Sequence, residues 1–251
     1  MSVETLSNWQ SDIRLTVGIL GLGSLGGRVA ELLAKKGVSR LLISDSDIYK
    51  AENLSSHILP PYFLGYPKSV AIKKTLDFLS YKHSSIEITD NDLKVLKESD
   101  LVIVTVGDNA SFDKLVFSDV LNTINSPVIW AWVSPYNILS HIVITSKYTG
   151  CLNCYYGMCS DHPDLVKLKN KMHEELERHG LEEYDLCGNP HTHSISERME
   201  FLATQIVSVV DYYTKHKRFK FDYVQYYWGI NDIIPTAKTG YLKKHPNCVC
   251  K

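Results

Sequence analysis

Features that mark three specialised classes of protein are missing from the sequence. No apolar run approaches the roughly 20 residues that a membrane-spanning helix needs, and the first five residues lack the basic and apolar regions of a signal peptide. We therefore expect a cytoplasmic protein without a membrane partner. The 27 lysines and arginines are balanced by 28 acidic residues, which leaves a net charge of -1. Without a basic excess to neutralise phosphates, we expect no nucleic-acid partner.

The sequence also lacks internal repeats and low-complexity linkers. Its 251 residues, 44% of them hydrophobic, are enough to bury a substantial core. We interpret residues 1–251 as a single domain, in which residues 155–194 form an insertion between the two halves of a cysteine cluster. In a reducing compartment, the six cysteines indicate metal ligands or a reactive thiol, and they do not indicate disulfides.

The order of apolar segments predicts the fold class. Residues 15–20 are an apolar strand that runs into a glycine-rich loop, Val29, Leu32 and Leu33 recur at helical spacing, and residues 40–44 form a second buried strand. This strand–helix–strand unit predicts a parallel sheet. Further helices are expected at 68–79, 110–121, 163–179 and 196–216, and further strands at 86–88, 101–104, 128–132, 138–145 and around 219–228. We expect an α/β fold: a Rossmann-like, mostly parallel sheet with helices on both faces, and C-terminal strands that are antiparallel.

The glycine-rich loop has the pattern G-x-G-x-x-G at Gly21, Gly23 and Gly26. Between a strand and a helix, such glycines allow a tight turn and a close approach to phosphate, and the helix N-terminus supplies N–H groups. Asp45, followed by Asp47, lies near the place of a ribose-binding carboxylate, about 20 residues further along the chain. The pattern indicates a nucleotide without choosing between NAD and ATP, and a glycine turn that only packs is the alternative.

Two charged residues favour ATP. Asp108 follows a buried strand, so its carboxylate is expected at the strand's carboxyl end, where it is suited to bind Mg²⁺ against phosphates. Lys68 begins a helix after Gly65 and Pro67 and offers a compact positive charge to a phosphate. A dinucleotide site needs neither group. The alternative makes Asp108 a helix N-cap and Lys68 a surface charge.

The cysteines fall into two groups. Cys151 and Cys154 have zinc-knuckle spacing, and Cys248 and Cys250 complete a four-thiolate site for a structural Zn²⁺. Because only one residue separates the second pair, His245 and Cys159 are alternative fourth ligands, and unrelated buried cysteines are the competing interpretation. Cys187 stands apart, before Gly188 in a polar segment that leads into a helix. This position suits a nucleophilic thiol, although a packed and inert cysteine fits it as well.

Together these motifs, from about residue 15 to residue 250, resemble the ThiF/MoeB/HesA family of ubiquitin-activating-type adenylating enzymes. The resemblance implies ATP and Mg²⁺ as cofactors and adenylation of a C-terminal carboxylate. The partner would be a ubiquitin-like protein, a sulfur-carrier protein or a ribosomal peptide, and a homodimer is expected. The roles that it implies are nucleotide contacts by the glycine loop, ribose binding by Asp45, phosphate contacts by Asn53 and Lys68, Mg²⁺ binding by Asp108, acyl or sulfur transfer at Cys187, and zinc binding by Cys151, Cys154, Cys248 and Cys250.

The sequence departs from the family pattern in the residues that supply positive charge. The family motif N-L-x-R has arginine where this chain has Ser56, and we expect its arginine-bearing N-terminal helix to be missing. Either Arg14, Arg28, Lys73 or a partner's residue then compensates, or the activity is weak. A catalytically degenerate partner of an active homologue is the second interpretation, and an NAD-dependent oxidoreductase is the third. For a dimer interface, we expect apolar surface at residues 130–132 and 223–228.

Overall fold

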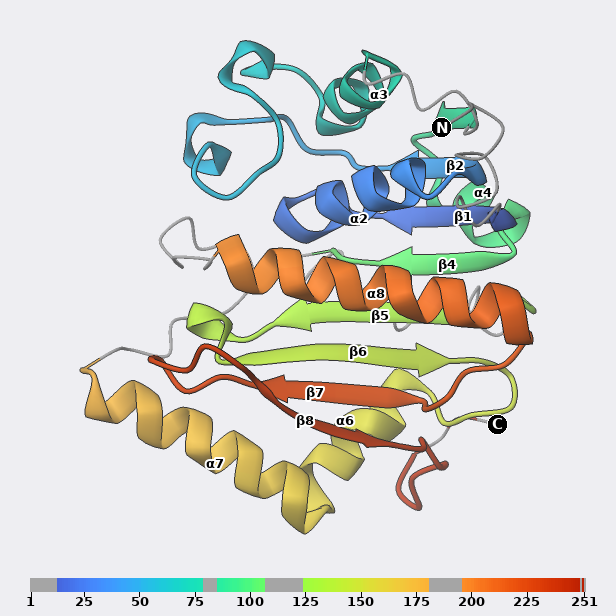
Figure 1. Ribbon diagram of the computed structural model, residues 1–251. Coiled ribbons are helices and arrows are strands. Elements are labelled where there is room, and N and C mark those ends of the chain that lie inside the picture. The colour runs from blue at the N-terminus through green and yellow to red at the C-terminus, as the bar shows by residue number, and fades with distance from the viewer. Residues whose placement is uncertain (1–12, 79–84, 107–123, 181–195, 249, 251) are drawn as a thin grey trace, which may run out of the picture. The chain divides into compact units, whose positions relative to one another are not determined.

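The structure is a computed structural model that describes residues 13–78, 85–106, 124–180, 196–248 and 250. The chain divides into two compact units, which are described separately below. Figure 1 labels the helices and strands of both units. Unit one contains Met1–Val106 and Met199–Lys220, and unit two contains Gly107–Arg198 and Phe221–Lys251. Asp108, Cys187 and the helix expected at 110–121 lie outside the described residues.

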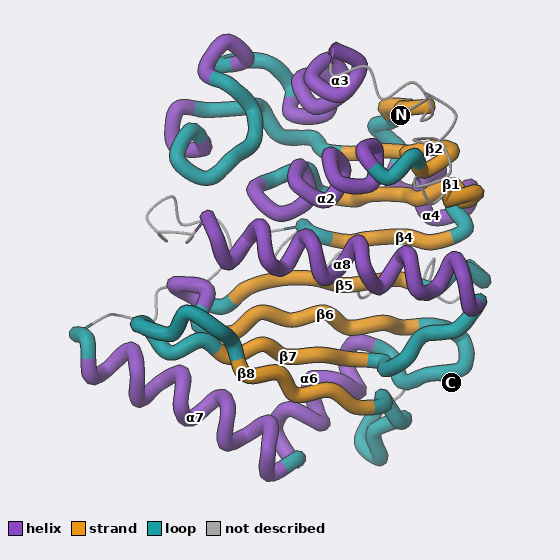
Figure 2. The backbone as a smooth tube through the Cα atoms, viewed as in Figure 1, coloured by secondary structure: helices purple, strands orange, loops and turns teal. Residues whose placement is uncertain are grey.

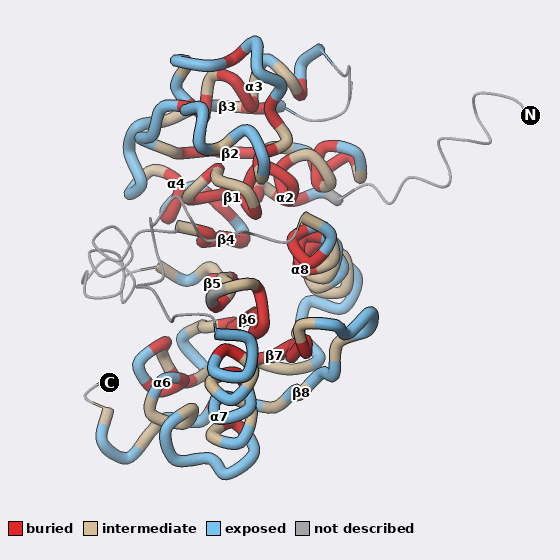
Figure 3. Tube along the Cα trace, turned by 90° about the vertical axis from the view of Figure 1, so that its left-hand side faces the viewer, coloured by how far each residue is buried: buried red, intermediate tan, exposed pale blue. Residues whose placement is uncertain are grey.

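Unit one contains a parallel sheet in the strand order β3-β2-β1-β4. The strands are β1 Ile13–Leu20, β2 Val38–Ser44, β3 Ser85–Ile88 and β4 Leu101–Val104. Successive residues of β2 and β4 are buried, which is typical of parallel strands that are covered on both faces. Figure 3 shows helices α2 and α4 on opposite faces of these strands. The helices of the unit are α2 Ser24–Lys35, α3 Lys68–Phe78, α4 Asp92–Glu98 and most of α8 Ser196–His216.

Unit two contains antiparallel strands in the order β5-β6-β7-β8 (Figure 2). The strands are β5 Val128–Val133, β6 Leu139–Thr145, β7 Tyr223–Tyr227 and β8 Thr236–Gly240, and the helices are α6 Leu152–Asp161 and α7 Pro163–Arg178. Met172 and Leu176 of α7 pack with Ile138, Leu139 and Tyr227 in a buried apolar cluster. This cluster holds the amphipathic helix α7 against the ends of β6 and β7.

The predicted fold class is confirmed: parallel strands between helices come first, and antiparallel strands follow. The predicted apolar surface is wrong. Trp130 is only 1% exposed and Tyr223 only 3% exposed, and every residue of β7 is buried. The aromatic side chains of these two stretches are therefore packed within the chain, apart from Trp132, which is half-buried.

Candidate nucleotide site and cysteine cluster

The glycine loop joins β1 to α2, and each of its three positions requires or permits glycine for a different structural reason. Gly21 has a φ of +86°, a backbone angle that residues other than glycine rarely adopt. A Cβ on Gly26 would lie 2.0 Å from the Gly21 carbonyl oxygen and 2.5 Å from Oγ1 of Thr105, the residue after β4, so this close packing requires glycine there. A Cβ on Gly23 would meet no described atom within 4 Å. Gly23 therefore borders open space, which fits a loop that a phosphate approaches closely.

Asp45 connects the end of β2 to this loop. Its Oδ2 accepts a hydrogen bond from the Leu22 N–H at 2.5 Å, and its Oδ1 accepts one from the Asp47 N–H at 2.7 Å. Burial raises the pKa of this half-buried carboxyl, while the two backbone donors act in the opposite direction. Each carboxylate oxygen has a second lone pair. Asp45 thus fixes the loop and keeps acceptor capacity for a ligand hydroxyl.

Lys68 lies beside the same strand end. It begins α3, its N–H donates to the Asp47 carbonyl at 2.9 Å, and its Nζ lies 2.8 Å from Asp47 Oδ2. The Lys68 side chain is 10% exposed, whereas the Asp47 side chain is 69% exposed. The ammonium is therefore held in place from within the fold, and its partner carboxylate lies at the surface.

Asn53 belongs to a one-turn 3₁₀ helix, Ala51–Asn53, between β2 and α3. Its Oδ1 accepts the Lys50 N–H at 3.0 Å, and its carbonyl accepts the N–H groups of Ser56 and His57 at 3.2 and 2.9 Å. Asn53 therefore organises the segment that runs to His57. Gly21, Gly23, Gly26, Asp45, Asp47, Asn53 and Lys68 all belong to unit one, whereas the Mg²⁺ ligand predicted at Asp108 is outside the described residues.

Sequence reasoning missed His57. Its Nδ1 accepts the Leu59 N–H at 3.1 Å, so its Nε2 carries the proton and donates to the Leu22 carbonyl at 2.7 Å. Burial lowers the pKa of this imidazole to about 4, and the positive charges of Lys68 and Arg28 act in the same direction. The neutral ring links the segment around Asn53 to the glycine loop. No sequence signal identifies this contact, because 35 residues separate its two partners.

The three cations considered as substitutes for an arginine at position 56 lie in different surroundings. Arg28 donates from Nη1 to the Ser56 carbonyl at 2.5 Å. Lys73 pairs instead with Asp77 at 2.9 Å on α3, and Arg14 is exposed. Arg28 is thus placed against Ser56.

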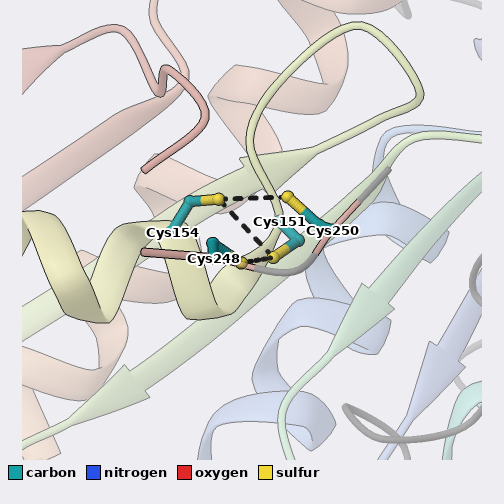
Figure 4. Close-up of side chains that lie close together, drawn as sticks. All are labelled: Cys151, Cys154, Cys248 and Cys250. Carbon is teal, nitrogen blue, oxygen red and sulfur yellow. Dashed lines mark hydrogen bonds between the residues drawn. The ribbon is translucent and has the colours of Figure 1, made fainter. Parts of the chain in front are cut away.

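In unit two, the structure brings together the four predicted cysteine ligands (Figure 4). The Sγ atoms of Cys151 and Cys154 are 3.7 Å apart, those of Cys151 and Cys248 are 3.4 Å apart, and those of Cys154 and Cys250 are 3.3 Å apart. All four lie within 4.8 Å of one another. Ligands at about 2.3 Å from a tetrahedral Zn²⁺ would be separated by about 3.8 Å. The donor set and its spacing therefore fit zinc.

The two alternative ligands have other roles. His245 Nε2 lies 2.8 Å from Asp161 Oδ2, and its ring covers Gly157, where a Cβ would lie 2.8 Å from the imidazole. This contact holds the C-terminal segment against α6. Cys159 accepts a hydrogen bond from Gln225 Nε2 at 3.5 Å and is not part of the cysteine group. Burial raises its thiol pKa to about 11, so it is poorly suited to be a thiolate.

Comparisons with known proteins identify the family and agree with the fold. The sequence pattern of the ThiF family matches residues 8–171. Ubiquitin-like modifier-activating enzyme 5 of Rattus norvegicus is 23% identical over 97% of this chain and 59% of its own length, and that of Gallus gallus is 25% identical over 93% and 58%. A crystal structure of Escherichia coli MccB with ATP superposes with a TM-score of 0.68 at 18% identity, over 96% of this chain and 68% of MccB. The chain thus spans a little under three fifths of the length of these two activating enzymes.

The parallel strands, the glycine loop that Asp45 anchors and the cysteine group belong to one α/β chain of the ThiF type. The chain belongs to the ThiF family. Among the described helices, none combines the length and the apolar character that crossing a bilayer requires.

Proposed function

We propose that this chain binds ATP and adenylates the C-terminal carboxylate of a ubiquitin-like protein, a sulfur-carrier protein or a ribosomal peptide. The observation that carries the proposal is the arrangement at the ends of β1 and β2. There, Asp45 holds the glycine loop through the Leu22 N–H, and Lys68 is held next to Asp47. Membership in the ThiF family and the named activities of relatives support the same reaction.

Each residue has a proposed role in binding ATP. The open side of Gly23 and the first N–H groups of α2 would face the phosphates of ATP. Asp45 and Asp47 would bind the ribose. Asn53 and Lys68 would also contact the phosphates. Asp108 is the proposed Mg²⁺ ligand. When bound, Mg²⁺ would neutralise charge on the phosphate oxygens.

In the reaction, an oxygen of the substrate carboxylate attacks the α-phosphorus. The bond from the α-phosphorus to the bridging oxygen breaks, and pyrophosphate leaves with the electron pair. Lys68 would stabilise the charge on the leaving pyrophosphate. In a second step, the Cys187 thiolate attacks the acyl carbon and AMP leaves, which yields a thioester on the enzyme.

The four-cysteine group has a structural role in this proposal. It joins the start of α6 to the C-terminal segment, about a hundred residues later in the chain. A closed four-thiolate zinc site has no open position for substrate. Removing the zinc should therefore destabilise unit two and leave the residues of the nucleotide site unchanged.

The proposed active form is a homodimer in which the whole chain acts as one adenylation domain, with residues 155–194 as an insertion. A second candidate is a catalytically degenerate partner of an active homologue. The observation that favours this candidate is Ser56, which supplies no positive charge where the family motif has arginine. An NAD-dependent oxidoreductase would leave Lys68 and the cysteine group without a role.

ATP–pyrophosphate exchange with candidate carrier proteins tests the proposal. We expect exchange that depends on Mg²⁺ and on the carrier's C-terminal carboxylate, and that is lost in Asp108→Ala. Calorimetry with ATP and with NAD separates the nucleotides. Binding of ATP without exchange for any carrier would favour the degenerate partner, and tighter binding of NAD would refute the adenylation proposal.

A further inference from the structure

Arg28 is a buried cation inside unit one. It lies on α2, one turn after Ser24 of the glycine loop, and its side chain is only 5% exposed. A buried guanidinium is costly unless it is paired and hydrogen-bonded. Its surroundings therefore indicate what Arg28 does.

The guanidinium joins three separate segments. Nη1 donates to the carbonyl of Ser24 at 2.7 Å and to the carbonyl of Ser56 at 2.5 Å, and Nε lies 2.6 Å from Glu200 Oε1 on α8. The Ser56 carbonyl also accepts the Ser24 hydroxyl. The planar fork of arginine allows this geometry, which the point charge of a lysine does not.

The contacts of Arg28 complement those of His57. Arg28 binds the carbonyl of Ser56 to the first turn of α2. The next residue, His57, donates from its own Nε2 to the Leu22 carbonyl. A Cβ on Gly27 would lie 3.3 Å from the His57 ring, so α2 and this segment are in close contact. Segment 53–57, which contains Asn53, is thus fixed against the glycine loop at two consecutive residues.

We propose that Arg28 is a positioning residue: oriented by Glu200, it fixes segment 53–57 against the glycine loop, and the affinity for ATP depends on this contact. The inference rests on the proposed function, because it assumes that ATP binds at this loop. In this proposal Arg28 does not touch the nucleotide, because its side chain is buried. It acts through Asn53 and through the loop backbone, whose positions it sets.

Three variants test the inference. Arg28→Met removes the fork and keeps the aliphatic stem, and Glu200→Gln keeps the shape of the side chain that orients it. Glu200 is 55% exposed, so Glu200→Gln should fold even if Arg28→Met does not. Lys36→Met is the matched control. Lys36, the residue after α2, also pairs with α8, at 3.8 Å from Asp211, and it forms no ion pair or hydrogen bond with segment 53–57 in the described part of the chain.

Calorimetry should show about tenfold weaker ATP binding for Arg28→Met and about threefold weaker binding for Glu200→Gln, with Lys36→Met within a factor of two of wild type. Hydrogen exchange at the His57 amide, measured without nucleotide, should be faster in Arg28→Met and unchanged in Lys36→Met. Wild-type ATP affinity in both Arg28→Met and Glu200→Gln would overturn the inference. If the wild-type protein does not bind ATP, the proposed function fails. Hydrogen exchange at the His57 amide then still decides whether Arg28 fixes segment 53–57.

Discussion

The Nζ of Lys68 and the Oδ2 of Asp47 are 2.8 Å apart at the end of β2, although 21 residues separate them. The pair places a positive charge where the proposed nucleotide would present its phosphates. A phosphate has more negative charge than the carboxylate and would compete with Asp47 for the ammonium group. ATP affinity should therefore depend on Lys68 more than on any other lysine of α3.

We expect Lys68→Met to weaken ATP binding by about tenfold, on the order of 1.4 kcal/mol, because the phosphates lose a charged donor. Lys73→Met is the control, since Lys73 lies on the same helix and pairs with the exposed Asp77. Calorimetry on both variants measures the difference. Equal affinities for the two variants would show that the position of Lys68 has no special role.

The cysteine group leads to a prediction of zinc content. We expect one Zn²⁺ per chain, with Zn–S distances near 2.3 Å, and we expect Cys154→Ser to lose the metal and several kcal/mol of stability. Cys159→Ser is the matched control, because Cys159 lies on the same helix α6 and outside the group. Elemental analysis and urea unfolding make both measurements. Loss of zinc in Cys159→Ser would contradict the assignment, and so would the absence of zinc from wild-type protein purified without chelator.

Much of unit one could be predicted because its pattern is local. Continuous apolar runs at 15–20 and 40–44 mark buried parallel strands, and the glycine pattern marks the turn between a strand and a helix. Helix α6 was not predicted, because Gly157 and the two cysteines of the knuckle obscure its periodicity. Strand β8, with the sequence Thr-Ala-Lys-Thr-Gly and mostly exposed residues, has no apolar alternation to reveal it.

The contacts that organise the site depend on tertiary structure. At Ser56 the sequence reveals only that the family arginine is replaced, because the bond from Arg28 to the Ser56 carbonyl depends on how segment 53–57 folds back on α2. The burial of the aromatic residues of β7 cannot be predicted from the sequence for a related reason. An apolar strand has the same sequence pattern whether its outer face is bare or covered, and here both faces are covered.

Two buried histidines predict that stability falls at acidic pH. Burial lowers the pKa of His57 to about 4 and that of His141, a buried residue of β6, to about 3, whereas histidine in the unfolded chain titrates near 6.5. Between these values the unfolded state binds more protons, so the free energy of unfolding decreases as the pH falls from 6.5 towards 4. The loss is on the order of 3 kcal/mol for each ring. Urea unfolding at a series of pH values measures it, and His57→Gln should make the dependence shallower. A flat profile in wild type would contradict the burial of these rings.

The proposed transfer step leads to the prediction with the clearest separation of roles. Adenylation needs no thiol, so Cys187→Ala should retain ATP–pyrophosphate exchange at the wild-type rate. It should lose any conjugate between enzyme and carrier that a reducing thiol cleaves, because no thiolate remains to capture the acyl group. Cys159→Ala controls for the removal of a thiol elsewhere, since burial keeps that cysteine protonated. Non-reducing electrophoresis after incubation with ATP and carrier detects the conjugate. If Cys187→Ala still forms the conjugate, the acceptor is another residue. If neither the wild type nor any variant forms the conjugate while ATP–pyrophosphate exchange proceeds, the reaction ends at the acyl-adenylate.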